Sequence, residues 1–483
     1  MTQQQPFAAR IVSGGISMLS SQVIGLTLAF LAQRIILSTL TKEENGELFA
    51  YRRIADFLVI ILCDLGLNSV AMRKMAQMPE KAEEILTSVG VIRLVMGGIA
   101  AVLSMVTAAA SGHGVVGVGV WAIYVLISSR AGLLRYTLET PIRMKVRFGL
   151  VSVLSIVDGA LFLLAIWLMK NQLSISVIIG SFIASTVPSF IVLLVLDKGQ
   201  HLRPSRASKA MISELVREAL PMILAVILVN VHDKIDAFML EWFSTPVEVG
   251  IFAAAYQSLA PFVNTIPIAA VMAIVPVVVR LASEDMGSCR SYALTGLRLL
   301  AAAGIGVAMA ASMMTPWIIE FISEGRYADN EGQFFAFLWM TFPVFLLFYI
   351  QEINIALGVQ RKNIVITAIL ATVTVIGGLW LIPLYASYGA IAAKFAAVLG
   401  AAAVAYINFH RILEQSITLR GVIGILGAAA VCAGSAVWLP TVMPRPIAIV
   451  CGVLVWTLAV AAAGLVRAAD VQRMRSMFQR TLA

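Results

Sequence analysis

Residues 41–52 read TKEENGELFAYR, and residues 245–256 read TPVEVGIFAAAY. The two stretches align from Thr41 onto Thr245, and the Thr, one Glu and the Gly stay in register. Self-similarity at a fixed spacing is the sequence signature of a repeated architecture. We therefore expect the chain to contain two copies of one structural unit.

Weaker internal similarity extends the repeat. MKVRFGLVSVLSI, from Met144, resembles GVQRKNIVITAIL, from Gly358, and YGAIAAKF, from Tyr388, echoes the first pair. These matches predict two six-helix bundles that run in the same direction, related by a pseudo-twofold axis along the membrane normal. In transporters with such repeats the substrate path lies between the halves, near the bilayer midplane.

The hydropathy of the chain predicts an all-α, polytopic membrane protein. Of its 483 residues 60% are hydrophobic and 13% are charged, and the mean hydropathy is +0.93. Apolar runs of about 20 residues, the length that crosses a bilayer as a helix, recur along the whole chain. About fourteen spans are expected, at residues 11–38, 47–67, 85–108, 115–138, 148–169, 174–196, 214–240, 248–280, 291–318, 333–357, 363–384, 388–409, 417–438 and 446–466.

Basic residues test the order of these spans, because Lys and Arg stay in cytoplasmic connections. They gather in every second connection, which predicts that both termini are cytoplasmic. The resulting domain prediction is a first six-helix lobe at 1–197, a cytoplasmic linker at 198–213, a second lobe at 214–410, and two added helices with a cytoplasmic tail at 411–483.

Short connections and missing motifs argue against enzyme activity. No connection is long enough for a catalytic domain, and the sequence contains no GxxxxGK[ST], GxSxG, HExxH or CxxC motif. No cofactor and no metal site are therefore expected. The formal net charge of +9 is explained by topology and by anionic lipid headgroups, so nucleic acid is not an expected partner.

Five cations share one predicted depth, roughly 6 to 12 Å below the outer membrane face at 1.5 Å per helical residue. Charged side chains within spans usually face a bundle interior or a water-filled cavity. An inward-facing layer would bind a phosphate, diphosphate or carboxylate group. The alternative is snorkelling, in which the long side chains reach the headgroups. The candidate anion-binding residues are Arg34, Arg52, Arg53, Lys234 and Lys394.

Acidic residues within the spans are candidates for ion coupling. Asp56 follows Arg52 by four and Arg53 by three, so an intrahelical pair is expected there, and only one of the two arginines can face a lumen squarely. HDKID, residues 232–236, could form a proton or sodium site or a neutralised structural cluster. The coupling candidates are Asp158, Asp233 and Asp236.

Taken together, five stretches resemble the polysaccharide flippases of the multidrug/oligosaccharidyl-lipid/polysaccharide exporter superfamily. The stretches are LTKEENGELFAYRR (40–53), DLGLN (64–68), KIDAFML with TPVEVGIFAAAYQ (234–257), ALGVQRKN (356–363) and IPLYASYGAIAA (382–393). The resemblance implies two lobes around a central cavity and the transport of a lipid-linked oligosaccharide. Related peptidoglycan-precursor flippases carry a cation in the eighth span, where this chain has Tyr256 and Gln257, and that difference argues against a peptidoglycan precursor as substrate.

The resemblance implies a flippase in the bacterial inner membrane that moves an undecaprenyl-diphosphate-linked repeat unit of lipopolysaccharide or exopolysaccharide. Expected partners are membrane lipids, H⁺ or Na⁺, glycosyltransferases and a polysaccharide polymerase. A multidrug exporter of the same superfamily and a membrane-embedded glycan polymerase or ligase stay open as alternatives.

Overall fold

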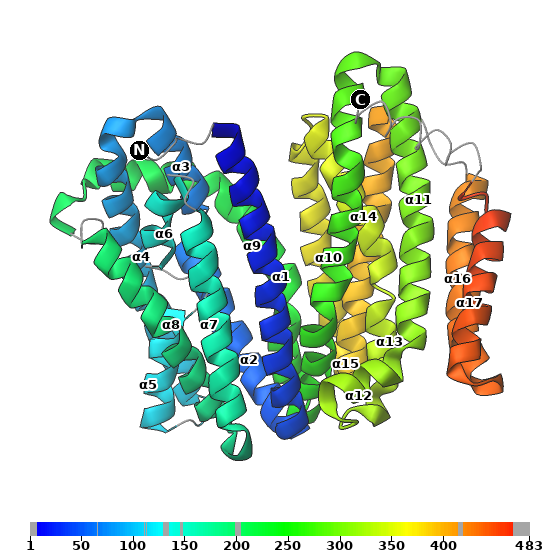
Figure 1. Ribbon diagram of the computed structural model, residues 1–483, viewed down its shortest axis with the longest axis horizontal. Helices are drawn as coiled ribbons and strands as arrows, with labels where there is room; N and C mark the ends of the chain where they lie inside the picture. Colours follow the sequence, from blue (N-terminus) through cyan, green and yellow to red (C-terminus); the bar gives the residue numbers. More distant parts are fainter. Residues whose placement is uncertain are drawn as a thin grey trace. The chain divides into compact units, whose positions relative to one another are not determined.

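The computed structural model describes residues 7–64, 66–110, 112, 114–128, 135–144, 148–198, 204–413 and 419–466. Every regular element in these ranges is a helix, as the sequence predicts (Figure 1). The chain divides into two compact units, Met1–Trp242 and Phe243–Ala483.

The first unit consists of nine α-helices and five short helical turns. The α-helices are α1 (Phe7–Thr39), α2 (Lys42–Val59), α3 (Leu67–Gln77), α4 (Ala82–Ala110), α5 (Val115–Ile123), α6 (Arg135–Met144), α7 (Phe148–Leu168), α8 (Ile175–Asp197) and α9 (Lys209–Phe243). The short turns are η1 (Ile60–Asp64), η2 (Pro79–Lys81), η3 (Tyr124–Ser128), η4 (Lys170–Gln172) and η5 (Pro204–Arg206).

The repeated Thr residues begin corresponding helices in the two units. Thr41 caps α2 in a capping box: its hydroxyl accepts the Glu44 N–H at 3.2 Å, and the Glu44 carboxylate accepts the Thr41 N–H at 3.0 Å. Thr245 caps α10 (Pro246–Glu284) by accepting the Glu248 N–H at 3.4 Å. The aligned Thr therefore has the same helix-starting role in both copies, in each case by accepting the N–H of the aligned Glu.

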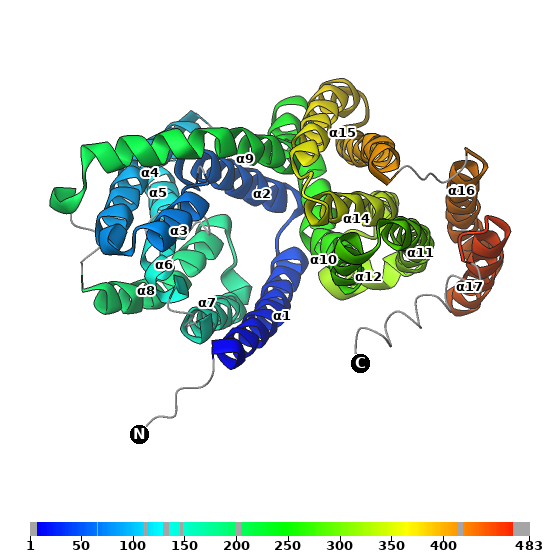
Figure 2. The same cartoon turned by 90° about the horizontal axis from the view of Figure 1, so that it is seen from above.

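Helix packing in the first unit places α7 between α1, α6 and α8. Figure 2 shows α1 beside α7 when the molecule is seen from above. Gly159 allows the close approach, since a Cβ there would lie 3.3 Å from the Leu28 side chain, and the Ser21 hydroxyl donates to Ser152 at 3.2 Å. Because of this packing, the middle of α7 faces neighbouring helices.

Two turns of the first unit are π-helical, η1 at the end of α2 and η3 at the end of α5. A π turn rotates the following residues relative to an ordinary α-helix. Both described parts of the predicted span 115–138, residues 115–128 and 135–138, are helical, and α6 carries the buried charges described below.

The second unit contains α10 and seven further α-helices. They are α11 (Met286–Met313), α12 (Thr315–Ser323), α13 (Glu331–Leu338), α14 (Thr341–Ala356), α15 (Arg361–Leu413), α16 (Leu419–Val442) and α17 (Arg445–Ala462), with the short turn η6 (Ala328–Asn330).

The long element α15 is two helices joined at Ala386, which has φ 48° and ψ −122°. The sequence predicts a break here, between spans ending at 384 and beginning at 388. The chain folds back so closely that a Cβ on Gly389 would lie 2.1 Å from the Leu381 carbonyl oxygen. Only glycine fits this approach, and the break therefore depends on Gly389.

The last two helices form a hairpin that packs on α11 (Figure 1). The Trp456 indole donates to the Ala302 carbonyl at 2.9 Å and lies over Gly306, where a Cβ would be 2.8 Å from the ring. The contact of Trp456 with Gly306 is thus one of the attachments of these two helices, together with the ion pair of Arg445 and Glu331 at 3.0 Å.

Replacing that glycine tests the attachment. Gly306→Val is expected to push Trp456 out of its site and to destabilise the fold by about 1–3 kcal/mol, the usual cost of overpacking. The measurement is thermal unfolding of the purified protein in detergent. Gly427→Val on α16 is the control, because a Cβ at Gly427 meets nothing within 4 Å; equal losses in the two variants would contradict the assignment.

In the described residues, nine helices are long and apolar enough to cross a membrane, and α15 among them contains two of the expected spans. The chain is therefore a multi-pass membrane protein. The expected spans 11–38, 47–67, 115–138 and 214–240 are also helical in their described parts, so fourteen spans stay a prediction. The compact units divide after Trp242, which groups α9 with the first unit, and the predicted lobe boundaries stay a prediction as well.

Candidate functional site

Helices α2 and α9 meet through an ion-paired triplet. The Arg53 Nη1 lies 3.1 Å from the Asp233 Oδ2, and the Lys234 Nζ lies 3.0 Å from the same oxygen. One turn away, the rings of Phe57 and Phe238 pack edge to face with centroids 5.2 Å apart. Three of the candidate residues from the sequence, Arg53, Asp233 and Lys234, are therefore brought together.

The two cations of this triplet are largely buried, unlike those of a surface ion pair. The exposed fractions of the Arg53 and Lys234 side chains are 13% and 9%, whereas that of Asp233 is 37%. Two cations that are mostly withdrawn from water share one carboxylate that still reaches solvent. Such a pair can open when a stronger anion competes for the guanidinium or the ammonium group.

The adjacent arginines of α2 point to different neighbours. The Arg53 guanidinium stacks over Phe49, 5.2 Å from its centroid, whereas the Arg52 guanidinium lies 5.7 Å from the centroid of Phe182 on α8. Among the described residues, Arg52 meets no carboxylate. Stacking leaves the in-plane N–H groups of a guanidinium available for hydrogen bonds, so Arg52 can still bind an anion.

The expected intrahelical pairing of Asp56 is wrong in the described part of the chain, where no ion pair joins Asp56 to Arg52 or Arg53. Arg53 turns instead to Asp233, 180 residues away in sequence. A partner on another helix gives the guanidinium a partly buried carboxylate, whereas an exposed i,i+3 pair adds only a few tenths of a kcal/mol.

The predicted cations Arg34 and Lys394 belong to other helices, α1 and α15. Arg34 is half-buried near the end of α1. Lys394 lies on α15 in the second unit, 5% exposed, with its Nζ 5.5 Å from the centroid of the Tyr256 ring. Tyr256 stands in the region where the related flippases carry a cation, and here its ring contacts one. A ring of all five cations stays a prediction.

The coupling candidates have different surroundings. Asp236 is 3% exposed, and its Oδ1 accepts the N–H of Ala237 at 2.9 Å. Asp158, at the middle of α7, forms an ion pair with Arg135 of α6. Arg135 also holds Glu139, with its Nε 2.8 Å from the Glu139 Oε1.

Arg135 and Glu139 are not among the candidate site residues that the sequence predicts. The available signal was their i,i+4 spacing, which pairs opposite charges on one helical face. The structure also buries Arg93 of α4 completely, where it donates to the Thr137 hydroxyl at 2.9 Å. Helix α6 therefore presents polar side chains to the interior of the first unit.

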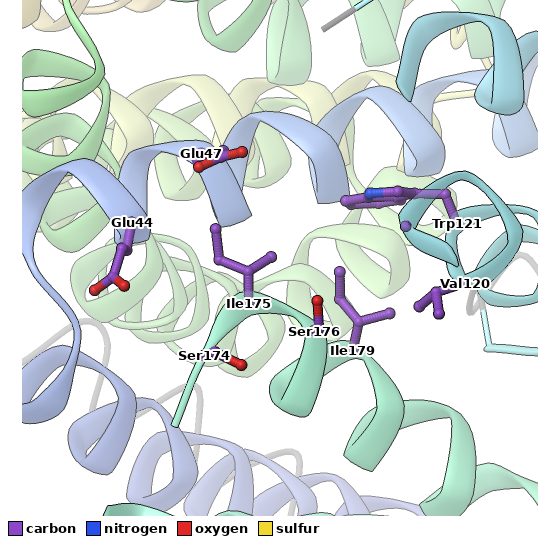
Figure 3. A pocket seen from close by; sticks show the side chains of 9 residues that line it. Glu44, Glu47, Val120, Trp121, Ser174, Ile175, Ser176 and Ile179 are labelled. Carbon is purple, nitrogen blue, oxygen red and sulfur yellow. The ribbon is translucent and has the colours of Figure 1, made fainter. Parts of the chain in front are cut away.

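A pocket of about 280 Å³ lies in the first unit between the beginnings of α2 and α8 (Figure 3). Glu44 and Glu47 lie on one side, Ser174 and Ser176 on the other, and Trp121 closes one end. Carboxylates repel phosphate, so this pocket does not suit a diphosphate. It suits hydroxyl groups or a cation, with the indole as a flat apolar wall.

The corresponding helix beginnings in the second unit are joined directly. The Glu248 carboxylate accepts hydrogen bonds from the Ser387 N–H, at 3.2 Å, and from the Ser387 hydroxyl. The Gln333 amide lies 3.4 Å from the same hydroxyl. Glu44 and Glu248 occupy equivalent positions in the repeat, but Glu44 is turned toward the Thr41 N–H of its own helix.

These features define a polytopic α-helical membrane protein with charged groups inside its helix bundles. In the described ranges no group of three or more His, Cys, Asp or Glu is arranged to hold a metal. The profile of the polysaccharide biosynthesis protein family matches residues 11–282, more than half of the chain, and the protein belongs to that family.

Solved structures agree on the fold. The chain is similar to the lipid II flippase MurJ in an inward-closed conformation, with a TM-score of 0.69 and 11% identity, over 93% of this chain and 98% of that one. It is also similar to an inward-facing multidrug resistance MATE family transporter of the MOP superfamily (TM-score 0.61, 13% identity, 80% and 94% covered).

A third similar structure is a MOP superfamily transporter from Pyrococcus furiosus, described as having a binding pocket of reverse polarity (TM-score 0.53, 14% identity, 84% and 95% covered). No curated protein sequence matches the chain. The three structural neighbours are a flippase and two transporters, and their similarity to this chain is one of fold.

Proposed function

We propose that this protein is a flippase that moves a polyprenyl-diphosphate-linked oligosaccharide repeat unit from the cytoplasmic to the outer leaflet of a bacterial inner membrane. The family and the similarity in fold to a lipid II flippase support this proposal. The substrate, the membrane and the direction are the proposal. The product would be used by a polysaccharide polymerase, and glycosyltransferases would supply the substrate.

The observation that carries this proposal is the pair of arginines on α2. Arg52 has planar N–H donors and meets no carboxylate among the described residues, and Arg53 with Lys234 shares the half-exposed Asp233. A diphosphate has the charge and the oxygen geometry to bind Arg52 bidentately. In this proposal the arriving diphosphate first binds Arg52 and then competes with Asp233 for Arg53 and Lys234.

The balance of charges favours a mechanism in which the diphosphate replaces Asp233 as the partner of Arg53 and Lys234. It argues against a site that attracts anions through a large net positive charge. In residues 52–56 of α2 and 233–236 of α9, three cations (Arg52, Arg53, Lys234) are accompanied by three carboxylates (Asp56, Asp233, Asp236), which leaves no net charge. A diphosphate therefore has to be bound by specific groups. Lys394 in the second unit and the coupling candidates Asp158, Asp233 and Asp236 stay parts of the proposal.

A multidrug exporter is the second candidate, and the acidic pocket favours it. Glu44 and Glu47 beside Trp121 would suit an aromatic cation better than a diphosphate. The acidic pocket therefore favours a cationic substrate, whereas the Arg52 site favours an anionic substrate.

A two-substrate assay in proteoliposomes separates the candidates. The purified protein is expected to flip a fluorescent undecaprenyl-diphosphate oligosaccharide above the protein-free background, and to leave the distribution of an aromatic cationic dye unchanged. Transport of the dye with no flipping of the lipid would establish the exporter instead. A Glu44→Gln/Glu47→Gln variant should keep flipping if the pocket has no role in binding the diphosphate.

A further inference from the structure

The pocket between the beginnings of α2 and α8 contains a buried donor group. Trp121 of α5 is 3% exposed, and its indole ring extends into the pocket (Figure 3). Tyr51 and Tyr124 pack against this ring, with ring centroids 4.9 Å and 5.6 Å away. Among the described residues, no atom accepts a hydrogen bond from the indole N–H, although a buried tryptophan N–H usually has a partner. This N–H is therefore available to a ligand in the pocket.

The other polar groups around the pocket are mostly acceptors. The Glu44 and Glu47 carboxylates only accept hydrogen bonds, and the Ser174 and Ser176 hydroxyls can accept or donate. No described residue that lines the pocket is a lysine, arginine or histidine. The Glu241 carboxylate, near the end of α9, is close enough to Glu47 for their charges to repel. A ligand that fits this pocket donates to the carboxylates and accepts from the indole.

Sugar hydroxyl groups meet both requirements. A hydroxyl donates one hydrogen bond and accepts others, so a sugar can serve the carboxylates and the indole N–H together. A cation has no acceptor for the indole, and a phosphate places acceptors against acceptors. Ile175 and Ile179 give the C–H face of a sugar ring an apolar wall. The volume of about 280 Å³ lies just below the roughly 300 Å³ at which pockets for drug-sized ligands begin, so a single sugar ring fits better than a larger molecule.

The pocket and Arg52 lie along one face of α8. Ile175, Ile179 and Phe182 share this face, since they are spaced i, i+4 and i+7. The two isoleucines line the pocket, and the Arg52 guanidinium lies 5.7 Å from the centroid of Phe182. Position 182 is about 10 Å beyond position 175 at 1.5 Å per residue. A short saccharide attached to a diphosphate at Arg52 therefore reaches the pocket.

We propose that this pocket is the saccharide subsite of the flippase, and that it binds a neutral sugar of the repeat unit and rejects a sugar with an acidic group. The inference rests on the proposed function, because it takes the diphosphate to be at Arg52. A uronic acid would place its carboxylate among the oxygens of Glu44 and Glu47. This holds whichever other partners these two carboxylates have, because a carboxylate oxygen in an ion pair is still an acceptor.

The affinities of two matched lipids for the purified full-length protein test the subsite. One probe is undecaprenyl diphosphate with a glucose disaccharide, and the other has the glucuronic acid disaccharide, so that either ring can report. Dissociation constants are measured by native mass spectrometry. The wild type is expected to bind the glucose lipid about tenfold more tightly, the ratio for one acceptor left without a donor.

Replacing the two carboxylates by amides should remove this preference. Glu44→Gln/Glu47→Gln keeps the side-chain lengths and the helix cap, since glutamine also serves in a capping box, and it adds N–H donors. It should bind the glucuronic acid lipid about tenfold more tightly than the wild type does, a gain that misfolding cannot produce. Glu43→Gln/Glu80→Gln is the matched control, because it removes two negative charges from exposed positions outside the pocket and should keep the preference.

Filling the pocket provides a second test. Ser176 is exposed at the pocket wall, so Ser176→Phe adds a ring there without removing a buried group. It should lower the affinity for the glucose lipid to that for undecaprenyl diphosphate without sugar. Ala184→Phe, at an exposed position about two turns further along α8, should leave the affinity for the glucose lipid unchanged.

Two results would overturn the saccharide subsite. One is equal binding of the two disaccharide lipids by the wild type, and the other is a preference for glucose that is unchanged in Glu44→Gln/Glu47→Gln. Either result leaves the proposed function intact, since the diphosphate still binds. A wild type that binds none of the three lipids contradicts the proposed function and the subsite together.

Discussion

Arg52→Ala is expected to slow flipping of a polyprenyl-diphosphate oligosaccharide by on the order of 10- to 100-fold, with normal folding. The guanidinium has no acidic partner in the described residues, so its removal leaves no buried carboxylate unpaired. The loss is that of charged hydrogen bonds to a phosphate, about 1.5–3 kcal/mol. The measurement is the initial flipping rate in proteoliposomes with matched protein content.

The neighbouring arginine provides the sharpest comparison. Arg53→Ala removes one of two cations from Asp233, and Lys234 continues to hold that carboxylate at 3.0 Å. We therefore expect a smaller loss of rate than for Arg52→Ala. Arg52→Lys should fall in between, because an ammonium group keeps the charge but loses the planar fork.

A control is available outside the site. Arg280 is about half exposed and pairs with Glu284 on the same helix, so Arg280→Ala removes an arginine without touching α2. It should flip lipid at the wild-type rate. If Arg52→Ala matches this control, Arg52 does not bind the diphosphate.

The sequence predicted the parts of the fold that depend on local rules. Thr41 and Thr245 each begin a helix, as their shared register indicates, and the break expected between 384 and 388 occurs at Ala386. A capping residue or a glycine acts within one turn of its own position. Such features can be predicted from a single short stretch of the amino-acid sequence.

Contacts between distant residues were harder to predict. Local spacing suggested Asp56 as the partner of the α2 arginines, whereas Arg53 pairs with Asp233 of α9. Which helix lies opposite is decided by packing along the whole bundle. The sequence drew attention to charged residues on both helices, but it did not indicate that Arg53 pairs with Asp233.

Charges near the predicted end of a span were misread for a related reason. Arg135 follows residues that the sequence assigned to one continuous span, and basic residues at span ends usually face the cytoplasm. Arg135 instead pairs with Glu139 on its own helix and with Asp158 on α7. Which carboxylate lies opposite a helix is decided by packing between helices, so the inward direction of these residues could not be predicted.

The largest effect on stability is expected from Arg135→Ala. The substitution removes the guanidinium that contacts Glu139 and Asp158, whose side chains are 4% and 13% exposed. Breaking a buried ion pair from one side costs roughly 3–5 kcal/mol, because the remaining charge is uncompensated. We expect little folded protein at neutral pH, measured as the monodisperse fraction in size-exclusion chromatography and as thermal unfolding in detergent.

The cause of that loss can be isolated, since neutral acids no longer need the arginine. Arg135→Ala/Glu139→Gln/Asp158→Asn should recover most of the folded fraction, although it has three substitutions instead of one. Acidic buffer should also partly restore Arg135→Ala, because protonation removes the unpaired charge, while alkaline buffer should worsen it. If the triple variant is as unstable as Arg135→Ala at every pH, the arginine stabilises the first unit through packing of its side chain, and the two carboxylates are not the reason that it is needed.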